Sequence, residues 1–174
     1  YTVNVENKPD ERKIKRVENP ADRQPGWRNR SYLVQAGVPS GLTRRLTAGP
    51  LSPDGWEISP DGKRLLFFLD DQDLAARPYF SSRLYELDLA TLAVTEVFDD
   101  RWVDEAAYAP DGSARLLVRG SPSAFDNLGL TLPAGVQPND YGGQLYLYDR
   151  ERKQAAALTR NLGPDVARTW WSRT

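Results

Sequence analysis

The sequence predicts an all-β fold, specifically a partial β-propeller made of four-stranded antiparallel blades that is incomplete within this segment. One observation is a phrase that occurs twice, Ser59-Pro60-Asp61-Gly62 and Ala109-Pro110-Asp111-Gly112, each time before an apolar run. The other is a second repeat, in which Leu84-Tyr85-Glu86-Leu87-Asp88 is similar to Leu145-Tyr146-Leu147-Tyr148-Asp149. Repeats of about 50 residues, each with several short strands, are typical of propeller blades.

The repeated phrase encodes a tight turn between two strands. Pro presets φ for the first corner, Asp suits the second, and Gly adopts the positive φ that closes a bulged hairpin. We therefore expect an inner strand before each turn and a second strand after it. The predicted inner strands cover residues 56–59 and 106–109, and the second strands cover 64–69 and 115–118.

Apolar composition sets the second strands apart from the others. Residues 65–68 are Leu-Leu-Phe-Phe and residues 116–118 are Leu-Leu-Val, which suits strands that neighbouring blades cover on both faces. The remaining predicted strands are the third strands at 83–89 and 144–149 and the more polar outer strands at 43–47, 94–98 and 155–159.

These strands predict how the chain divides into blades. Residues 1–30 are a charged N-terminal extension or the end of an earlier blade, in which 1–5 is a candidate strand. The predicted blade segments are a partial blade at 31–48, a blade at 55–98, a blade with an insertion at 103–159 and the start of a next blade at 166–174. Because closed propellers need about four to eight blades, we expect this chain to be a piece of a longer polypeptide.

Composition and residue types exclude several functions. The net charge of −1 gives no reason to expect a nucleic acid partner, and no apolar run approaches the roughly 18 residues of a membrane span. Histidine and cysteine are absent, which excludes a His-based catalytic triad and a His or thiolate metal site in this segment. We therefore predict no catalytic residues, no metal and no cofactor here.

Acidic residues are the remaining candidates for chemistry. Asp104 and Glu105 open a predicted inner strand, and adjacent strand residues point to opposite faces, so at least one should face the central channel. Such an acid either contacts a ligand or makes a structural hydrogen bond. Carboxylates of several blades that converge in the channel would instead indicate a glycosidase. The aromatic residues near the inner strands are expected to pack between blades: Trp56, Trp102, Tyr108, Trp170 and Trp171.

An insertion at residues 121–143 lengthens the second blade, and we expect an ordered loop with its own small apolar anchor among Phe125, Leu128, Leu130 and Leu132. In a propeller, the loops between second and third strands share one rim with the connections between blades. The insertion should therefore project together with 99–105 and 161–165. Long loops on one rim suit recognition, and padding between blades is the alternative.

Several motifs resemble a known family. Ser59-Pro60-Asp61-Gly62-Lys63 and the Leu-Thr endings at Leu46-Thr47 and Leu158-Thr159 resemble the propeller repeats of the prolyl oligopeptidase family of serine peptidases. They resemble TolB-type propellers equally. Residues 123–146 and 158–172 favour the peptidases, specifically the dipeptidyl-peptidase-like and acyl-aminoacyl-peptidase-like bacterial members.

This resemblance implies a function for the segment. It would be the non-catalytic propeller part of a serine peptidase, gating the access of peptides to a C-terminal α/β-hydrolase domain encoded elsewhere in the chain. In dipeptidyl peptidases, propeller acids bind the free amino terminus of the substrate. Residues 102–105 are similar to that acidic element, and the resemblance therefore implies that Asp104 and Glu105 bind substrate. They depart from the element in lacking its paired glutamates.

The resemblance also bears on partners and location. The implied partners are a peptide substrate and the hydrolase domain, and a homo-oligomer remains open. The compartment is unknown, with a bacterial periplasmic or secreted location slightly favoured over a cytoplasmic one. The alternative function is a TolB-like propeller that acts as a protein-binding module.

Overall fold

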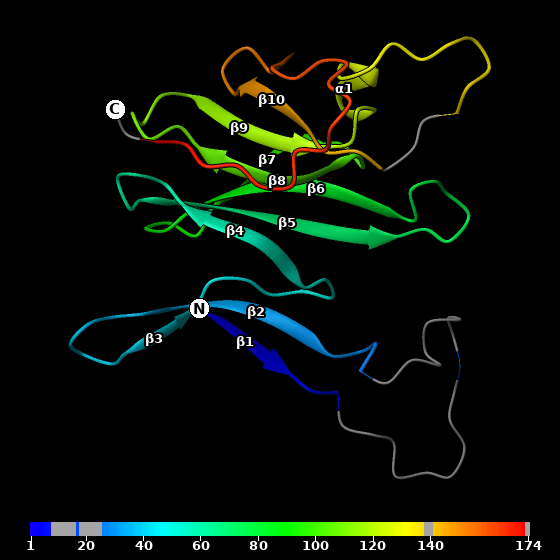
Figure 1. The fold of residues 1–174 in the computed structure, drawn as a ribbon. Helices are drawn as coiled ribbons and strands as arrows, with labels where there is room; N and C mark the ends of the chain where they lie inside the picture. The colour runs from blue at the N-terminus through cyan, green and yellow to red at the C-terminus, as the bar shows by residue number, and fades with distance from the viewer. Residues whose placement is uncertain (8–16, 18–25, 138–140, 173–174) are drawn as a thin grey trace. The chain divides into compact units, whose positions relative to one another are not determined.

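The computed structural model describes residues 1–7, 17, 26–137 and 141–172. The chain forms two compact units, Tyr1–Pro53 and Asp54–Thr174. The described residues are organised mainly as β-strands, with one short helical turn, α1 (Ala124–Asn127) (Figure 1). Most of the predicted charged extension, and the last two residues of the predicted next blade, lie outside the described residues.

The first unit contains a three-stranded sheet. Its strands are β1 (Thr2–Val5), β2 (Arg30–Ala36) and β3 (Thr43–Arg45), which are neighbours in that order. Both pairings are antiparallel, and β2 lies in the middle. The candidate strand at residues 1–5 therefore forms, and it belongs to the same sheet as the predicted outer strand at 43–47.

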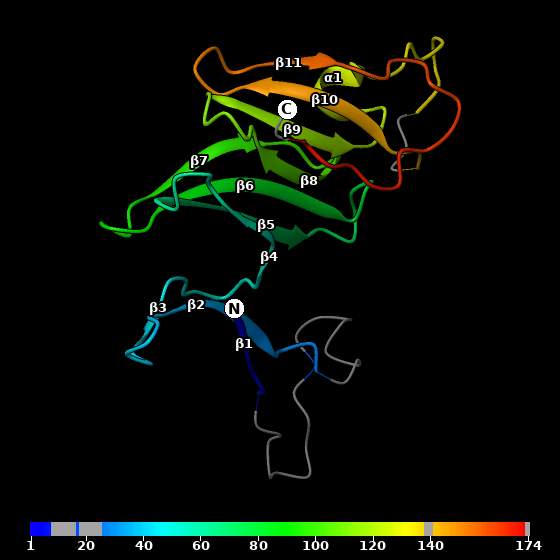
Figure 2. The same ribbon diagram turned by 60° about the vertical axis from the view of Figure 1, so that its left-hand side comes forward.

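The second unit contains two four-stranded sheets, which Figure 2 shows layered against each other. In both sheets, strands that are consecutive in the sequence are neighbours. The first sheet is β4 (Pro53–Ile58), β5 (Arg64–Gln72), β6 (Phe80–Asp88) and β7 (Val94–Asp99). The second is β8 (Val103–Tyr108), β9 (Arg115–Gly120), β10 (Gln144–Asp149) and β11 (Gln154–Ala157). The predicted all-β fold with four-stranded antiparallel blades is confirmed.

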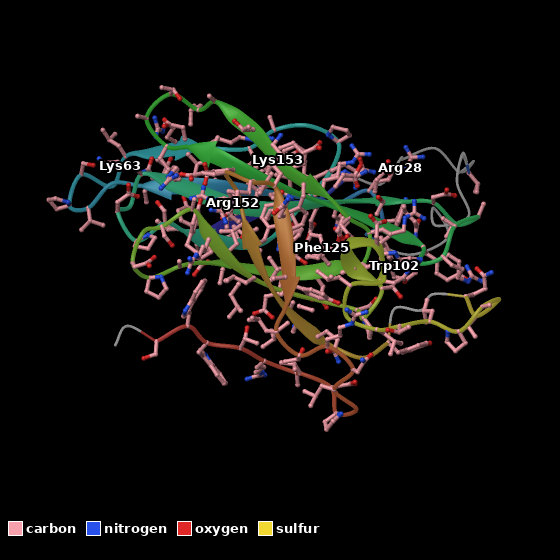
Figure 3. The ribbon with its side chains drawn as sticks, turned by 90° about the horizontal axis from the view of Figure 1, so that it is seen from above. Arg28, Lys63, Trp102, Phe125, Arg152 and Lys153 are labelled. Atoms are coloured by element: carbon pink, nitrogen blue, oxygen red, sulfur yellow. The ribbon has the colours of Figure 1, made fainter. Side chains whose placement is uncertain are left out.

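The turns between inner and second strands form as their sequence predicts. Gly62 and Gly112 have φ values of +71° and +73°, in the left-handed region that glycine tolerates. The N–H of Gly62 donates to the carbonyl of Ser59 at 2.8 Å, and Asp61 accepts from the N–H of Lys63 at 3.1 Å. Figure 3 shows Lys63 toward one end of the sheets, and Trp102 and Phe125 toward the other.

The main core of the second unit lies between its two blades. Residues 65–68 of β5 are all buried, as predicted for a strand covered on both faces. Leu66 and Leu84 from the first blade pack in one cluster with Val118 and Tyr146 from the second. Burial of these large side chains supplies the driving force that holds the blades face to face.

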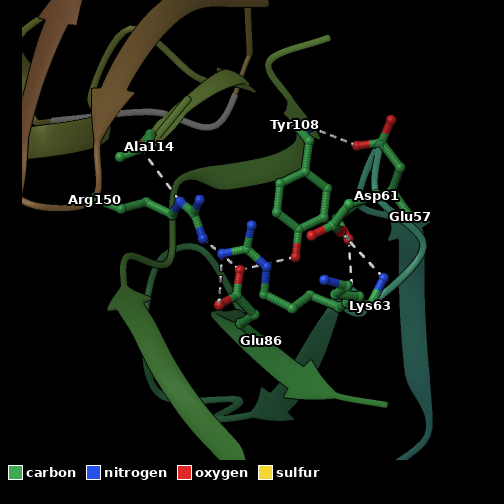
Figure 4. A network of polar contacts seen from close by, with 9 residues as sticks. Glu57, Asp61, Lys63, Glu86, Tyr108, Ala114 and Arg150 are labelled. Carbon is green, nitrogen blue, oxygen red and sulfur yellow. Dashed lines mark hydrogen bonds and ion pairs between the residues drawn. The ribbon is translucent and has the colours of Figure 1, made fainter. Parts of the chain in front are cut away.

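A polar network ties the two blades together beside this core (Figure 4). Glu86 on β6 forms an ion pair with Arg150, which follows β10, and accepts a hydrogen bond of 2.9 Å from the hydroxyl of Tyr108 on β8. Arg150 also donates to the carbonyl of Ala114 at 3.3 Å. Burial and the bond to Glu86 raise the pKa of the Tyr108 hydroxyl well above its usual range. The network therefore fixes β8 and β10 against β6.

Candidate functional site

The inner strands of the second unit border a cavity of about 580 Å³. β4 contributes residues 55–58 to its wall, β8 contributes 105–108, and the C-terminal segment contributes 169–171. Figure 1 shows that C-terminal segment, in red, running beside β8. Because the inner strands of successive blades surround the channel of a propeller, this cavity lies on the channel side of the blades.

Glu57 is the half-buried acid of this cavity. Its Oε2 accepts a hydrogen bond of 2.7 Å from the backbone N–H of Tyr108, across the gap between β4 and β8 (Figure 4). Burial raises the pKa of Glu57 above its ordinary value of 4.5, the bond from Tyr108 lowers it, and the charge of Glu105 raises it again. With the pKa raised overall, the protein surroundings disfavour the charged form of Glu57.

Asp104 and Glu105 lie at the start of β8, where the strand contains a bulge. Glu105 pairs with Arg119 and Val103 with Gly120, so Asp104 is the extra residue of the bulge. Both acids reach the same guanidinium: Asp104 Oδ2 lies 3.1 Å from the Arg119 terminal nitrogen, and Glu105 Oε2 lies 2.8 Å from Nε. The bulge therefore overrides the alternation of faces that the sequence suggests.

Only one of these two acids borders the cavity. Glu105 is among its lining residues, and Asp104 is not. Arg119 carries one positive charge against the two negative charges of Asp104 and Glu105, so the trio retains a net negative charge beside the cavity. The expectation that at least one acid faces the channel agrees with the position of Glu105, and a contact of either acid with substrate stays a prediction.

The aromatic residues divide into two groups. Tyr108 is buried and Trp102 packs against the core, as expected for residues between blades. The same expectation is wrong for Trp56 and Trp170, whose exposed fractions are 42% and 82%. Both line the cavity, where no strand among the described residues covers them. These two indoles are therefore exposed at the cavity wall, where the sequence predicts packing between blades.

Sequence reasoning missed Glu57. A signal was available, because Glu57 is the only charged residue in the predicted inner strand 56–59. Its partner across the cavity, the N–H of Tyr108, is 51 residues away and follows from the packing of one blade on the next. The sequence signal for a residue of this cavity is thus a charged side chain in an otherwise uncharged inner strand.

The loops of one rim meet as predicted. The N–H of Asn161 donates to the carbonyl of Gly129 at 2.9 Å, and the side-chain amide of Gln144 donates to the carbonyl of Leu162 at 3.0 Å. The predicted apolar anchor also forms, because Phe125 and Leu128 pack against the core. The insertion is therefore held to the connection that follows its own blade.

Two further classes of site are absent from the part of the chain that the structure describes. Among those residues, no group of three or more Asp or Glu side chains is arranged to hold a metal ion. None of the described helical segments has the length and apolar character needed to cross a bilayer.

Comparisons with known proteins find similarity at the level of solved structures. No protein-family model matches the chain, and no curated protein sequence matches it. The β-propeller domain of the Trilobed protease from Pyrococcus furiosus is 16% identical over 73% of this chain and 33% of that chain, with a TM-score of 0.47. The acylaminoacyl peptidase of Pyrococcus horikoshii is 18% identical over 76% of this chain and 21% of that chain, with a TM-score of 0.48.

A TolB protein is similar to the same degree. TolB from Acinetobacter baumannii is 22% identical over 76% of this chain and 38% of that chain, with a TM-score of 0.43. The chain thus spans less than two fifths of each of these three structures. Its own geometry defines its class: consecutive four-stranded blades with their inner strands on a shared cavity make it a β-propeller region.

Proposed function

We propose that this propeller region is the non-catalytic part of a serine peptidase of the prolyl oligopeptidase family, where it gates the access of peptides to an α/β-hydrolase domain encoded elsewhere in the polypeptide. The observation that carries the proposal is the channel-side cavity, which presents two carboxylates on inner strands and the exposed indoles of Trp56 on β4 and Trp170 on the C-terminal segment. Its volume of about 580 Å³ suits a short stretch of peptide.

The residue content of the chain also supports a propeller that binds substrate while another domain carries out catalysis. Histidine is absent from the sequence, so no Ser-His pair can form within it. The chain would therefore contribute binding and size selection, and the hydrolase domain would contribute the nucleophile, the base and the oxyanion hole. The resemblance of residues 123–146 and 158–172 to the peptidases of this family adds to the proposal.

Within this function, Glu105 contacts the substrate, and Asp104 acts on the substrate through the Arg119 that it shares with Glu105. Glu105 borders the cavity and can accept a charge-assisted hydrogen bond from a positively charged group of a peptide. Asp104 also pairs with Arg119, so the single positive charge of Arg119 neutralises Glu105 less than it would if Glu105 were its only partner. The two acids would thus act together, with Glu105 in contact and Asp104 balancing the guanidinium.

The test uses the intact protein with chromogenic peptides, a folded protein substrate and a fluorophosphonate that labels active serines. We expect labelling, hydrolysis of short peptides and no cleavage of the folded protein. Glu105→Gln and Asp104→Asn should each raise KM about tenfold with little change in kcat, since the first removes a charge-assisted contact made before the chemical step and the second leaves Arg119 to neutralise Glu105. Glu151→Gln, which removes an exposed carboxylate in the turn after β10, is the matched control.

Two results would argue against this proposal in different ways. Absence of both labelling and peptide hydrolysis would reject the peptidase. Normal peptide hydrolysis with unchanged kinetics in both acid variants would keep the peptidase and remove Asp104 and Glu105 from its binding site.

The second candidate function is a TolB-like protein-binding module. The observation in its favour is the exposure of apolar side chains on the described loops of one rim: Leu74, Val136, Tyr141 and Leu162. Exposed apolar surface on loops of a rigid scaffold is typical of protein recognition. An intact protein that fails to label with the fluorophosphonate, and that loses a crosslinked protein partner on Leu162→Glu but not on Glu151→Gln, would favour this module.

A further inference from the structure

We propose that the channel-side cavity binds an organic monocation, a guanidinium or alkylammonium group, between Glu57, Glu105 and Trp170. The inference rests on the proposed function for its biological setting and deepens it, because it names peptides with arginine or lysine side chains as the preferred class. The cation is thus a side chain, distinct from the free amino terminus of a peptide.

The described wall of the cavity carries negative charge. Among the described residues that line the cavity, Glu57 and Glu105 are the only ones with a charged side chain. The described partner of Glu57 is the neutral backbone N–H of Tyr108, at 2.7 Å. Glu105 shares the single charge of Arg119 with Asp104. The cavity wall is therefore net negative, and a bound cation would compensate it.

The two carboxylates of the cavity can each accept a further hydrogen bond. At Glu57, Oε2 accepts from Tyr108, and at Glu105, Oε2 accepts from Arg119 Nε at 2.8 Å. Each carboxylate has a second oxygen with lone pairs for another donor. A guanidinium has five N–H donors in a planar fork, and an ammonium has three, so either group can bond to both acids. A carboxylate or phosphate ligand has no donors to offer and would be repelled.

An exposed indole lies in the same wall as the two acids. Trp170 is 82% exposed and lines the same cavity as the two acids. The face of an indole attracts a guanidinium or ammonium group through its quadrupole, and it does so best among the aromatic side chains. Trp171 lines the cavity as well. The wall thus pairs an aromatic surface with acid oxygens, which is the combination that recognises organic cations.

The alternatives fit this cavity less well. Calcium requires six to eight oxygen ligands, whereas the cavity offers two carboxylates, and the described residues contain no metal-binding group of acids. A neutral sugar would stack on the indole but would leave the charge of Glu57 uncompensated. The cavity therefore selects for positive charge as well as for a flat apolar surface.

The test measures binding of a capped amino acid to the intact protein by calorimetry. The probe is N-acetyl-arginine amide, which has no free amino terminus, and its neutral isostere is N-acetyl-citrulline amide. We expect the arginine probe to bind at least about tenfold more tightly, as for a ligand that gains charge-assisted hydrogen bonds. Glu57→Gln and Glu105→Gln should each weaken binding about tenfold, and Trp170→Leu should weaken it severalfold.

The variants are chosen so that folding does not obscure the result. Glutamine retains an oxygen that can accept from the N–H of Tyr108 at position 57, or from Arg119 at position 105. Glu151→Gln lowers the total charge equally on an exposed turn and should leave binding unchanged. Thermal unfolding of every variant confirms that a folded protein is being compared.

Every outcome bears on the inference. Equal binding of the arginine and citrulline probes, undetectable binding of the arginine probe at millimolar concentration, or full binding in Glu57→Gln and Glu105→Gln would each overturn it. Tight binding of a neutral oligosaccharide at these residues would do the same. Loss of peptide hydrolysis with intact cation binding would instead reject the proposed peptidase, so the two failures are distinguishable.

Discussion

The side chain of Asp100 accepts a hydrogen bond of 2.7 Å from the backbone N–H of Phe125, 25 residues further along the chain. Its other carboxylate oxygen accepts from the backbone N–H of Trp102 at 2.9 Å. One partly buried carboxylate thus joins the connection between the two blades to the first turn of the insertion. This bond is the clearest reason why the loops of that rim are held together.

Asp100→Ala should therefore lower the free energy of unfolding by about 3 kcal/mol. The substitution leaves two N–H groups without their charged acceptor, and hydrogen bonds to charged groups contribute about 1.5–3 kcal/mol each. Denaturant unfolding of the intact protein measures the change. Asp126→Asn, at an exposed acid of the same insertion, should stay within about 0.5 kcal/mol of the natural protein. Equal effects of the two substitutions would contradict a special role for Asp100.

Phe125 anchors the insertion through its ring. Ring centroids lie 5.5 Å from Phe98, 5.3 Å from Tyr146 and 5.7 Å from Tyr148. Phe125→Ala should cost about 3 kcal/mol of unfolding free energy, because it opens a cavity in this aromatic cluster. Val136→Ala, at a half-exposed position of the same insertion, is the control and should cost less than about 0.5 kcal/mol. A loss below 1 kcal/mol at Phe125 would mean that the insertion is not anchored there.

Two glycines test how closely the connection at 161–166 approaches the insertion. A Cβ on Gly143 would overlap the carbonyl oxygen of Val166, whose N–H donates to the carbonyl of Gly143 at 2.9 Å. A Cβ on Gly163 meets nothing within 4 Å. Gly143→Ala should destabilise by about 1–3 kcal/mol as an overpacked contact, and Gly163→Ala should be neutral. Proteolysis of the two variants offers an independent readout, since faster cleavage near 161–166 is expected in Gly143→Ala alone.

The fold followed from the sequence because its signals are local. Residues 59–62 specify a turn through Pro, Asp and Gly, and residues 65–68 specify a buried strand through an unbroken apolar run. These features do not depend on the rest of the chain. The strands they predict therefore form within a few residues of the expected bounds.

The site depends on packing between blades, and the sequence could not supply that. The bulge at Asp104 arises from the register between β8 and β9, which turns both acids to Arg119. Glu57 gains its partner from the next inner strand, and Trp170 stays exposed because no described strand covers it. Side-chain surroundings of this kind follow from long-range geometry, so the sequence predicts candidate acids at the start of an inner strand but not their partners.

Glu57 gives the pH dependence of stability a definite sign. Burial raises the pKa of Glu57 in the folded protein above 4.5, its ordinary value, so the folded state binds a proton more tightly than the unfolded state. The free energy of unfolding should therefore fall as the pH rises from about 4.5 through the folded pKa of this group. At neutral pH the charged carboxylate then destabilises the fold relative to its protonated form.

Glu57→Gln should remove this loss. Glutamine does not titrate, and its oxygen still accepts from the N–H of Tyr108, so the variant should gain stability over the natural protein as the pH rises above about 4.5. Below that pH the difference between the two proteins should level off. Urea unfolding at several pH values between 4 and 7.5 measures it, with Glu151→Gln as an exposed control whose difference stays flat. A difference at Glu57 that shrinks with rising pH would show that the folded pKa is lowered, and hence that the fold stabilises the charged form of Glu57.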